Sequence, residues 1–217
     1  MEYLACPFEY EGKDSMVAML EEEYHTESTQ ASSPHIPQTA RELFDALPPL
    51  PGFRVEVIEG KLLVSPMGSP EHTWMAVDLH DALLPLRRER GWRGAPGGLN
   101  ICIEGPRDSL VPDFVLAPPD CPRWGAGELL SSGVLMVAEV VSPGSVDIDR
   151  KEKLRLYALG KVPIYLLIDP LAKDPSVTVF SDIEDDAYRV AVIAHVGKPI
   201  KLPAPVDFDL DTSIFKV

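Results

Sequence analysis

Three ionisable residues stand out in the sequence because of their types and their order along the chain. Asp113 stands at the head of a short apolar run, Glu139 interrupts a longer one at 134–141, and Lys153 lies in the amphipathic stretch that follows. Two carboxylates could hold a divalent cation, and a lysine could orient or activate a water beside it. These residue types are therefore suited to hydrolysis of a phosphate ester.

Glu139 needs the most explanation. Residues 134–141 are rich in Val and Leu without polar alternation, which is typical of a strand covered on both faces. A carboxylate there loses its hydration, at a large cost unless a partner offsets it. Mg²⁺ is one such partner, and Asp113 is the natural second ligand. Two alternatives stay open: Glu139 points outward at a strand end, or it pairs with an arginine.

The order Asp, then Glu in a following strand, then Lys resembles the PD-(D/E)XK nuclease superfamily. Longer strings resemble the Uma-type putative restriction endonuclease family within it. They are PDFV at 112–115, AEVVSP at 138–143, KLRLY at 153–157 and GKVPIYLLIDP at 160–170, with VEVIEG at 55–60 and the SP…H pattern of Ser65, Pro66 and His72 upstream. The resemblance covers roughly residues 40–217.

The lysine departs from the superfamily pattern. That pattern places it two residues after Glu139, where Val141 stands. The resemblance therefore implies a migrated lysine that reaches the site from the next helix. Lys153 fits best because the family's lysine lies four residues before a tyrosine, here Tyr157, and Lys151 is the fallback.

The resemblance also implies roles for these residues. Asp113, Glu139 and the backbone carbonyl of Val140 would hold Mg²⁺ or Mn²⁺. Lys153 would orient or help deprotonate the attacking water, or offset charge on the phosphate. Burial would lower the pKa of this lysine and the two acids would raise it, and the sequence does not decide which effect dominates.

Two further residues match family positions. Glu56 could complete the acidic cluster, although it could equally be an exposed acid of an alternating strand. His72 could take part in catalysis, although a lone histidine on a helix is more often structural. We therefore name Asp113, Glu139, Lys153, Glu56 and His72 as candidate catalytic residues.

Composition limits the possible functions. The net charge is −14, and residues 1–35 carry half of it, with eight acids against one lysine. Nucleic-acid binding usually accompanies excess Lys and Arg, so the acidic balance argues against it, although a local basic patch could remain in the rest of the chain. No apolar run is long enough to span a membrane, and no signal peptide is recognisable. Three widely spaced cysteines form neither a disulfide framework nor a metal knuckle, which favours the cytoplasm.

The pattern predicts an acidic, flexible tail at 1–38 and one restriction endonuclease-like domain at 39–217. The fold class is α/β, with a mixed central β-sheet flanked by helices and an added N-terminal β-hairpin that extends one edge. The expected elements are a helix capped by Thr39, a hairpin at 53–65, a helix at 69–90 kinked at Pro85, a turn at 92–98, strands at 99–104, 113–116, 134–141 and 163–169, an irregular stretch at 128–132, a helix capped by Asp147 or Asp149, and a meander over 176–202.

Three functions are compatible with these residues. The first is a metal-dependent endonuclease, with DNA as the expected substrate and a homodimer as the expected assembly. The second is a non-catalytic binding or interaction module that retains the nuclease fold, which the acidic balance and the displaced lysine would suit. The third is a metal-dependent hydrolase of small phosphate esters. The combination of Asp113, Glu139 and Lys153 favours the first.

Overall fold

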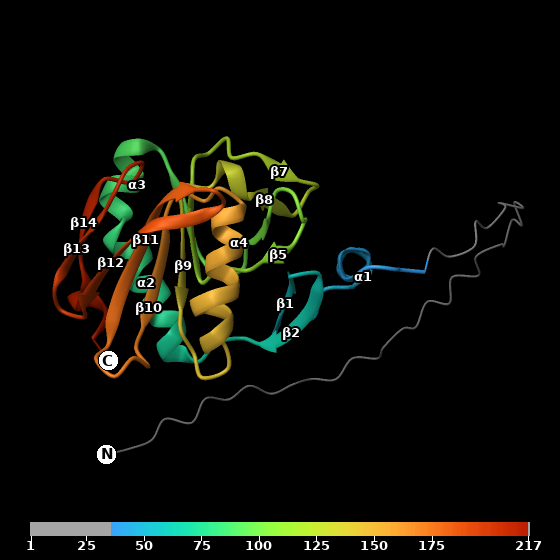
Figure 1. The fold of residues 1–217 in the computed structure, drawn as a ribbon, viewed down its shortest axis with the longest axis horizontal. Helices are drawn as coiled ribbons and strands as arrows, with labels where there is room; N and C mark the ends of the chain where they lie inside the picture. The colour runs from blue at the N-terminus through green and yellow to red at the C-terminus, as the bar shows by residue number, and fades with distance from the viewer. Residues whose placement is uncertain (1–35, 217) are drawn as a thin grey trace, which may run out of the picture. The chain divides into compact units, whose positions relative to one another are not determined.

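The computed structural model describes residues 36–216, in which two six-stranded sheets, a two-stranded sheet and four α-helices form one unit beginning at Pro37. Nearly all of the predicted tail at 1–38 lies outside the described residues. Figure 1 shows the larger elements arranged in layers.

The central sheet carries the candidate residues. Its strands lie in the order β12 (Ala187–His195), β11 (Ser176–Glu184), β10 (Tyr165–Asp169), β9 (Met136–Val140), β6 (Phe114–Ala117) and β3 (Arg93–Pro96). Strands β9 and β10 are parallel and the other pairs are antiparallel, so the sheet is mixed as predicted. The expected turn at 92–98 is wrong, because most of it forms β3 as an edge strand.

Both faces of the central sheet are covered, as the unbroken apolar run of β9 predicted. One face packs on α2 (Pro70–Ala82) and α3 (Leu84–Arg90), together with the hairpin of β13 (Pro199–Leu202) and β14 (Phe208–Asp211) and the closing turn η3 (Thr212–Phe215). The other face packs on α4 (Leu154–Leu159) and on the second sheet. Each large side chain buried in these layers contributes about 1.5–3 kcal/mol to stability.

The second sheet has the strand order β2 (Lys61–Pro66), β1 (Phe53–Ile58), β5 (Ser109–Leu110), β4 (Asn100–Cys102), β8 (Glu128–Leu130) and β7 (Arg123–Trp124). The β1–β2 hairpin is confirmed. Glu59 and Gly60 form its two-residue turn, both with positive φ, as a tight hairpin turn requires. The hairpin extends an edge of this sheet and not of the central sheet. The stretch at 128–132 is also ordered, as β8 followed by a 3₁₀ turn (Ser131–Gly133).

The helices begin and end where local chemistry requires. Thr39 and Glu42 form the expected capping box of α1 (Ala40–Ala46). The long helix predicted at 69–90 is divided at Leu83, two residues before Pro85, because proline interrupts the hydrogen-bond ladder of a helix. Within residues 36–216, no helix is both long enough and apolar enough to cross a bilayer.

The segment before α4 differs from the prediction. Residues Ile148–Lys153 form a π-helical turn, η2, and no side chain caps it. Asp147 occupies the N-cap position, as predicted, but its side chain makes no capping hydrogen bond, and the alternative of Asp149 is wrong. Asp147 instead pairs with Lys151 at the surface, and Asp149 is buried. π-Helical turns contain an extra residue and occur frequently at functional sites.

Candidate active site

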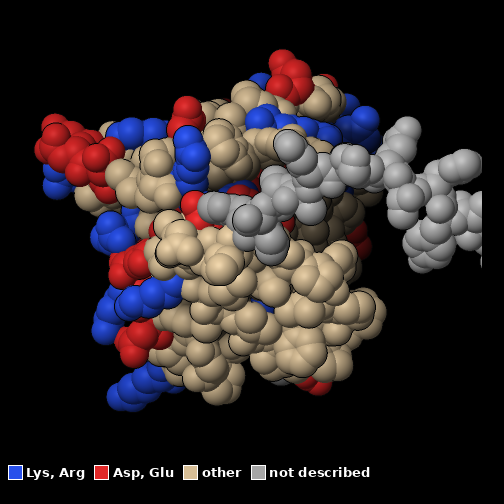
Figure 2. Space-filling view, turned by 90° about the vertical axis from the view of Figure 1, so that its right-hand side faces the viewer, with Lys and Arg blue, Asp and Glu red and all other residues tan. Residues whose placement is uncertain are grey.

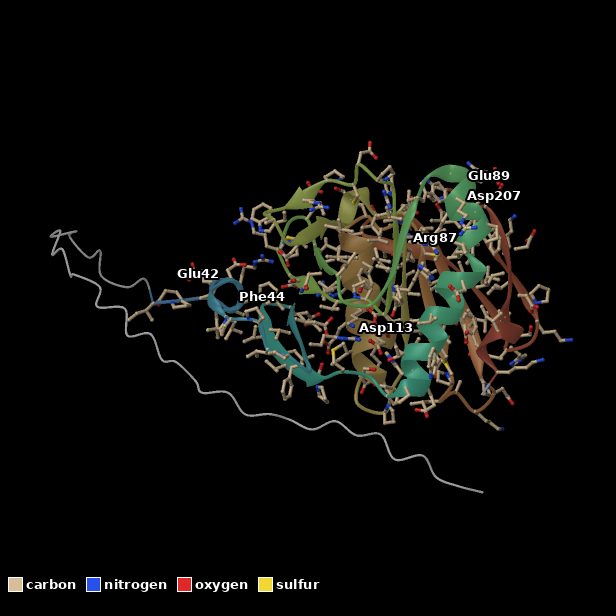
Figure 3. All side chains as sticks on the ribbon, turned by 180° about the vertical axis from the view of Figure 1, so that it is seen from behind. Glu42, Phe44, Arg87, Glu89, Asp113 and Asp207 are labelled. Atoms are coloured by element: carbon tan, nitrogen blue, oxygen red, sulfur yellow. The ribbon has the colours of Figure 1, made fainter. Side chains whose placement is uncertain are left out.

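The two candidate acids lie side by side at one end of the central sheet. Asp113 immediately precedes β6, Glu139 lies within β9, and the register pairs Phe114 with Ala138, the residues next to them. Neighbours in this antiparallel register project to the same face, which is the α4 face. Asp113 is 3% exposed and Glu139 is 0% exposed. Figure 3 shows Asp113 in the interior of the molecule, beside α2.

Asp113 is held by three donors. Nη2 of Arg54 lies 2.7 Å from Oδ1, and Nε2 of His72 lies 3.0 Å from Oδ2. The backbone N–H of Val140 also donates to Oδ2, at 2.8 Å. Burial alone would raise the pKa of Asp113, but the hydrogen bond from His72 and the charge of Arg54 hold this pKa well below its ordinary value. Asp113 is therefore an ionised carboxylate.

Lys153 joins the site from the π-helical turn. Its Nζ lies 3.1 Å from Oε1 of Glu139 and 3.2 Å from Oε1 of Glu56. It also lies 3.6 Å from Oδ1 of Asp149. Lys151 is exposed and pairs with Asp147 at 2.8 Å, so it is not near the two acids. Burial would lower the pKa of Lys153, but the acids, first of all Glu139, raise it above its ordinary value, so Lys153 remains a cation.

Glu139 has one satisfied oxygen and one free oxygen. The hydroxyl of Tyr157 donates to Oε1 at 2.6 Å, beside Lys153 on the same atom. Oε2 is buried and has no hydrogen-bond partner. Burial raises the pKa of Glu139 well above its ordinary value, and nearby acids add to this effect while Lys153 opposes it. Glu139 and Asp113 thus have pKa values shifted in opposite directions.

Four carboxyl groups form what we call the acidic cluster: Glu56, Asp113, Glu139 and Asp149. All are at most 3% exposed, so the alternative of Glu56 as an exposed strand acid is wrong. Glu56 accepts the backbone N–H of Val111 at 2.8 Å as well as the contact from Lys153. Two side chains with raised pKa values, Lys153 and Arg54, supply the positive charge that pairs with these acids. If all four acids were ionised, negative charge would exceed these two cations by two.

Sequence reasoning missed the parts of Arg54, Asp149 and Tyr157 in this site. Arg54 lies two residues before Glu56 on one strand and hence on the same face. Asp149 lies four residues before Lys153 and Tyr157 four after it, so one helical side brings them together. This periodicity was visible in the sequence. In the sequence, Tyr157 serves only to select Lys153, whereas the hydrogen bond that it donates to Glu139 makes it part of the site.

Among residues 36–216, no three His, Cys, Asp or Glu side chains come together as a ready-made metal site. The donors present are nevertheless oxygen atoms of the kind that Mg²⁺ and Mn²⁺ bind. The free Oε2 of Glu139 lies beside Asp113, in a cluster whose four carboxyl groups outnumber its two cations. A buried acceptor without a donor, in a region that favours positive charge, fits a divalent cation.

Two hollows reach the site from different sides. The first, which we call the α2 cavity, has a volume of about 890 Å³ and includes His72 and Val140 in its wall. The second, of about 660 Å³, lies between α1 and the second sheet and includes Arg54 and Val111. Figure 2 shows that the face carrying α1 and the β1–β2 hairpin is largely uncharged, with Lys and Arg side chains mostly near its margins. The acidic cluster is thus buried, but residues that contact it line both openings.

Comparison with known proteins identifies similar chains. A family model described as Uma2, "Putative restriction endonuclease", matches residues 41–213. A solved structure is also similar, a putative nuclease belonging to DUF820 from Anabaena variabilis ATCC 29413. The two share 19% identity with a TM-score of 0.63, over 82% of this chain and 97% of the other. The comparison with curated proteins found no match.

Proposed function

Because the chain belongs to the Uma2 family of putative restriction endonucleases, we propose that it is a metal-dependent endonuclease that hydrolyses phosphodiester bonds. The observation that carries this proposal is the buried, unpartnered Oε2 of Glu139 beside the ionised Asp113. The fold, shared with the structure of a putative nuclease, is consistent with it.

Asp113, Glu139 and the carbonyl of Val140 would hold Mg²⁺ or Mn²⁺. When bound, such a cation stabilises negative charge on phosphate oxygens and makes water a better nucleophile. The raised pKa of Glu139 means that this carboxyl group favours its protonated form in the absence of metal. Metal binding should therefore release a proton from the site and strengthen as the pH rises.

Lys153 and Arg54 would act on the substrate as cations. The raised pKa of Lys153 favours orientation of the attacking water and stabilisation of charge over proton abstraction. Arg54 donates to Asp113 through Nη2, while its Nε is buried without a partner. A non-bridging phosphate oxygen would satisfy this Nε–H donor, as guanidinium groups commonly bind phosphate. His72 would position Asp113 by the hydrogen bond to Oδ2.

We propose DNA as the substrate and the cytoplasm as the compartment. Cys102 and Cys121 are free and buried, which suits a reducing environment.

We also propose a homodimer, since two sites would allow cleavage of two strands. Light scattering at micromolar concentration tests the assembly, and a monomer would remove this part of the proposal. The predicted division into a tail at 1–38 and a domain at 39–217 also remains a proposal, which limited proteolysis would test by cutting near residue 38.

The first experiment is calorimetric titration of Mn²⁺ and Mg²⁺ into the wild type, Asp113→Asn and Glu139→Gln. We expect binding by the wild type and its loss in both variants, because each substitution removes a charged oxygen ligand at nearly constant volume. Asp207→Asn is the matched control, since Asp207 is an exposed acid that also pairs with a lysine. The same four proteins are then incubated with plasmid DNA and with single-stranded DNA, with each metal and with EDTA.

Equal heats in all four proteins, or in none, would mean that the acids are structural. Metal binding without cleavage of any nucleic acid would favour the second candidate, a binding module with a nuclease fold. The observation that favours this candidate is the depth of the acidic cluster, whose members are at most 3% exposed.

A further inference from the structure

The α2 cavity lies at the end of the central sheet where parallel strands β9 and β10 finish. Residues 140–143, with Ile168, Pro170 and Leu171, form one side of it, and the first two turns of α2 form another. Phe215 of the closing turn lies opposite, with Val196. In open α/β sheets, ligands commonly bind outside the carboxyl ends of the strands. The proposed metal and phosphate chemistry uses none of the apolar wall of this cavity.

The cavity and the acidic cluster share two residues. His72 and Val140 both line the cavity, and both contact Oδ2 of Asp113, at 3.0 and 2.8 Å. The side chain of Val140 packs on the α2 face, whereas Asp113 and Glu139 face α4. The cavity and the acids therefore lie on opposite faces of the central sheet, at the same end of β9. A nucleotide with its phosphate at Asp113 would have its base beside this opening.

The lining is apolar in its depth and mixed at its rim. Met75, Ile168 and Phe215 are all at most 6% exposed and provide apolar surface. The charged residues of the wall are Glu71, Asp174 and Lys216, so acids outnumber the one lysine. This balance disfavours a phosphate group in the cavity. It suits an uncharged planar ring whose faces pack on apolar side chains and whose edge meets polar groups such as Ser69 and Ser142.

We infer that the α2 cavity binds a nucleobase of the substrate, from the nucleotide next to the cleaved phosphate. The inference rests on the proposed function and adds a subsite to it. The volume of the α2 cavity lies within the range of small-molecule sites and accommodates a base with its sugar. In duplex DNA the base must leave its stack, at a cost of a few kcal/mol, whereas a single strand offers it freely. The enzyme should therefore prefer single-stranded or mismatched DNA at the cleaved position.

The test follows methionine methyl groups by NMR, without metal. The probes are 2′-deoxyadenosine 5′-monophosphate, thymidine 5′-monophosphate and, lacking a base, 2-deoxyribose 5-phosphate. The methyl of Met75 reports on the α2 cavity, and that of Met67, in the wall of the other hollow, is the internal control. We expect the two base-bearing probes to shift Met75 and leave Met67 unchanged, and the sugar phosphate to shift neither.

A pair of variants locates the binding. Leu171→Trp narrows the cavity at a side chain that is 46% exposed, and Val192→Trp adds the same ring at a side chain that is 48% exposed on β12, outside the cavity. Leu171→Trp should weaken nucleotide binding at least tenfold and Val192→Trp should not. No base-dependent shift of Met75 at millimolar probe, or equal binding by the two variants, would overturn the inference. Neither result would affect DNA cleavage by the wild type, whereas base binding in a protein that cuts no DNA with any metal would refute the proposed function alone.

Discussion

Two lysines of this chain each lie near more than one carboxylate, in opposite surroundings. Nζ of Lys153 is 3.1–3.6 Å from three acids, and its side chain is 3% exposed. Nζ of Lys201 is 2.8 and 3.6 Å from Asp207 and Asp209, and its side chain is 51% exposed. Figure 3 shows the same contrast for the acids, with Asp113 inside and Asp207 at the margin beside Glu89.

The comparison teaches that burial, more than distance, gives the acidic cluster its chemistry. Water screens Lys201 and its acids, so their attraction is weak. Lys153 and its three acids are at most 2% exposed, so bulk water screens them little and each charge depends on the others for stabilisation. Keeping one carboxyl group ionised while opposing the ionisation of its neighbour, as at Asp113 and Glu139, therefore depends on burial. Four predictions follow from this contrast, in order of decreasing effect.

Lys153→Met should destabilise the fold by about 3–5 kcal/mol, because it leaves buried acids without their cation. The free energy of unfolding is measured by urea denaturation at neutral pH, without metal. Lys201→Met is the matched control and should lower the urea midpoint far less, since water screens this pair. Equal decreases in the free energy of unfolding of the two variants would refute the contrast between the buried and the exposed lysine.

Tyr157→Phe should cost about 1–3 kcal/mol, since it removes the hydroxyl that donates to a buried carboxyl oxygen at 2.6 Å. Tyr188→Phe serves for comparison, because its hydroxyl donates to a neutral carbonyl, that of Val162, at 2.7 Å. Loss of this neutral bond should cost about 0.5–1.5 kcal/mol. Thermal unfolding of both variants ranks the contributions of the two hydrogen bonds to stability. A larger loss of stability for Tyr188→Phe would show that the acidic cluster does not strengthen its hydrogen bonds.

Glu139→Gln should raise the free energy of unfolding by on the order of 1 kcal/mol while abolishing metal binding. The raised pKa of Glu139 shows that the fold favours its neutral form, which glutamine imitates. Asp209→Asn, beside Lys201, is the control and should change neither property. Destabilisation by Glu139→Gln would mean that Glu139 is ionised in the fold. The attraction of Lys153 would then outweigh the opposing effects of burial and of the nearby acids.

Asp207 should titrate below the ordinary range for an aspartate, because the hydrogen bond from Lys201 lowers its pKa. A lowered pKa in the folded state favours folding above the ordinary pKa, and this contribution is lost as the pH falls through the lowered value. Carboxyl-carbon NMR measures the titration. In Lys201→Met the pKa should return toward the ordinary value, and an unchanged pKa would show that the pair is absent in solution.

Much of the fold could be predicted from the sequence because local signals determine it. The capping box at Thr39, the hairpin turn at Glu59–Gly60 and the parallel pair around α4 each have a pattern of their own. The second sheet could not be predicted as a unit. Its strands β5 and β7 have two residues each, too short to show a periodicity, and β5 joins the hairpin through Val57 and Ser109, which are distant in sequence.

The acids and lysine of the site could be named in advance, but their surroundings could not. An ionisable residue in an apolar run indicates burial, and the family pattern selected Lys153 over Lys151. Arg54 lies on a strand whose burial varies from residue to residue, and its contact with Asp113 spans 59 positions. Whether the pKa of Lys153 rises or falls depends on four acids at once, which only the folded arrangement brings together.

The π-helical turn that carries Lys153 has an evolutionary consequence. A lysine on a strand has two possible orientations, because a shift of one residue moves its side chain to the opposite face. A lysine on a helix turns by roughly 100° for each residue inserted or deleted before it. Removal of one residue within Ile148–Lys153 would therefore rotate Lys153 out of the cluster. A catalytic group could in this way be gained or lost by one codon, while the sheet that holds the acids stays unchanged.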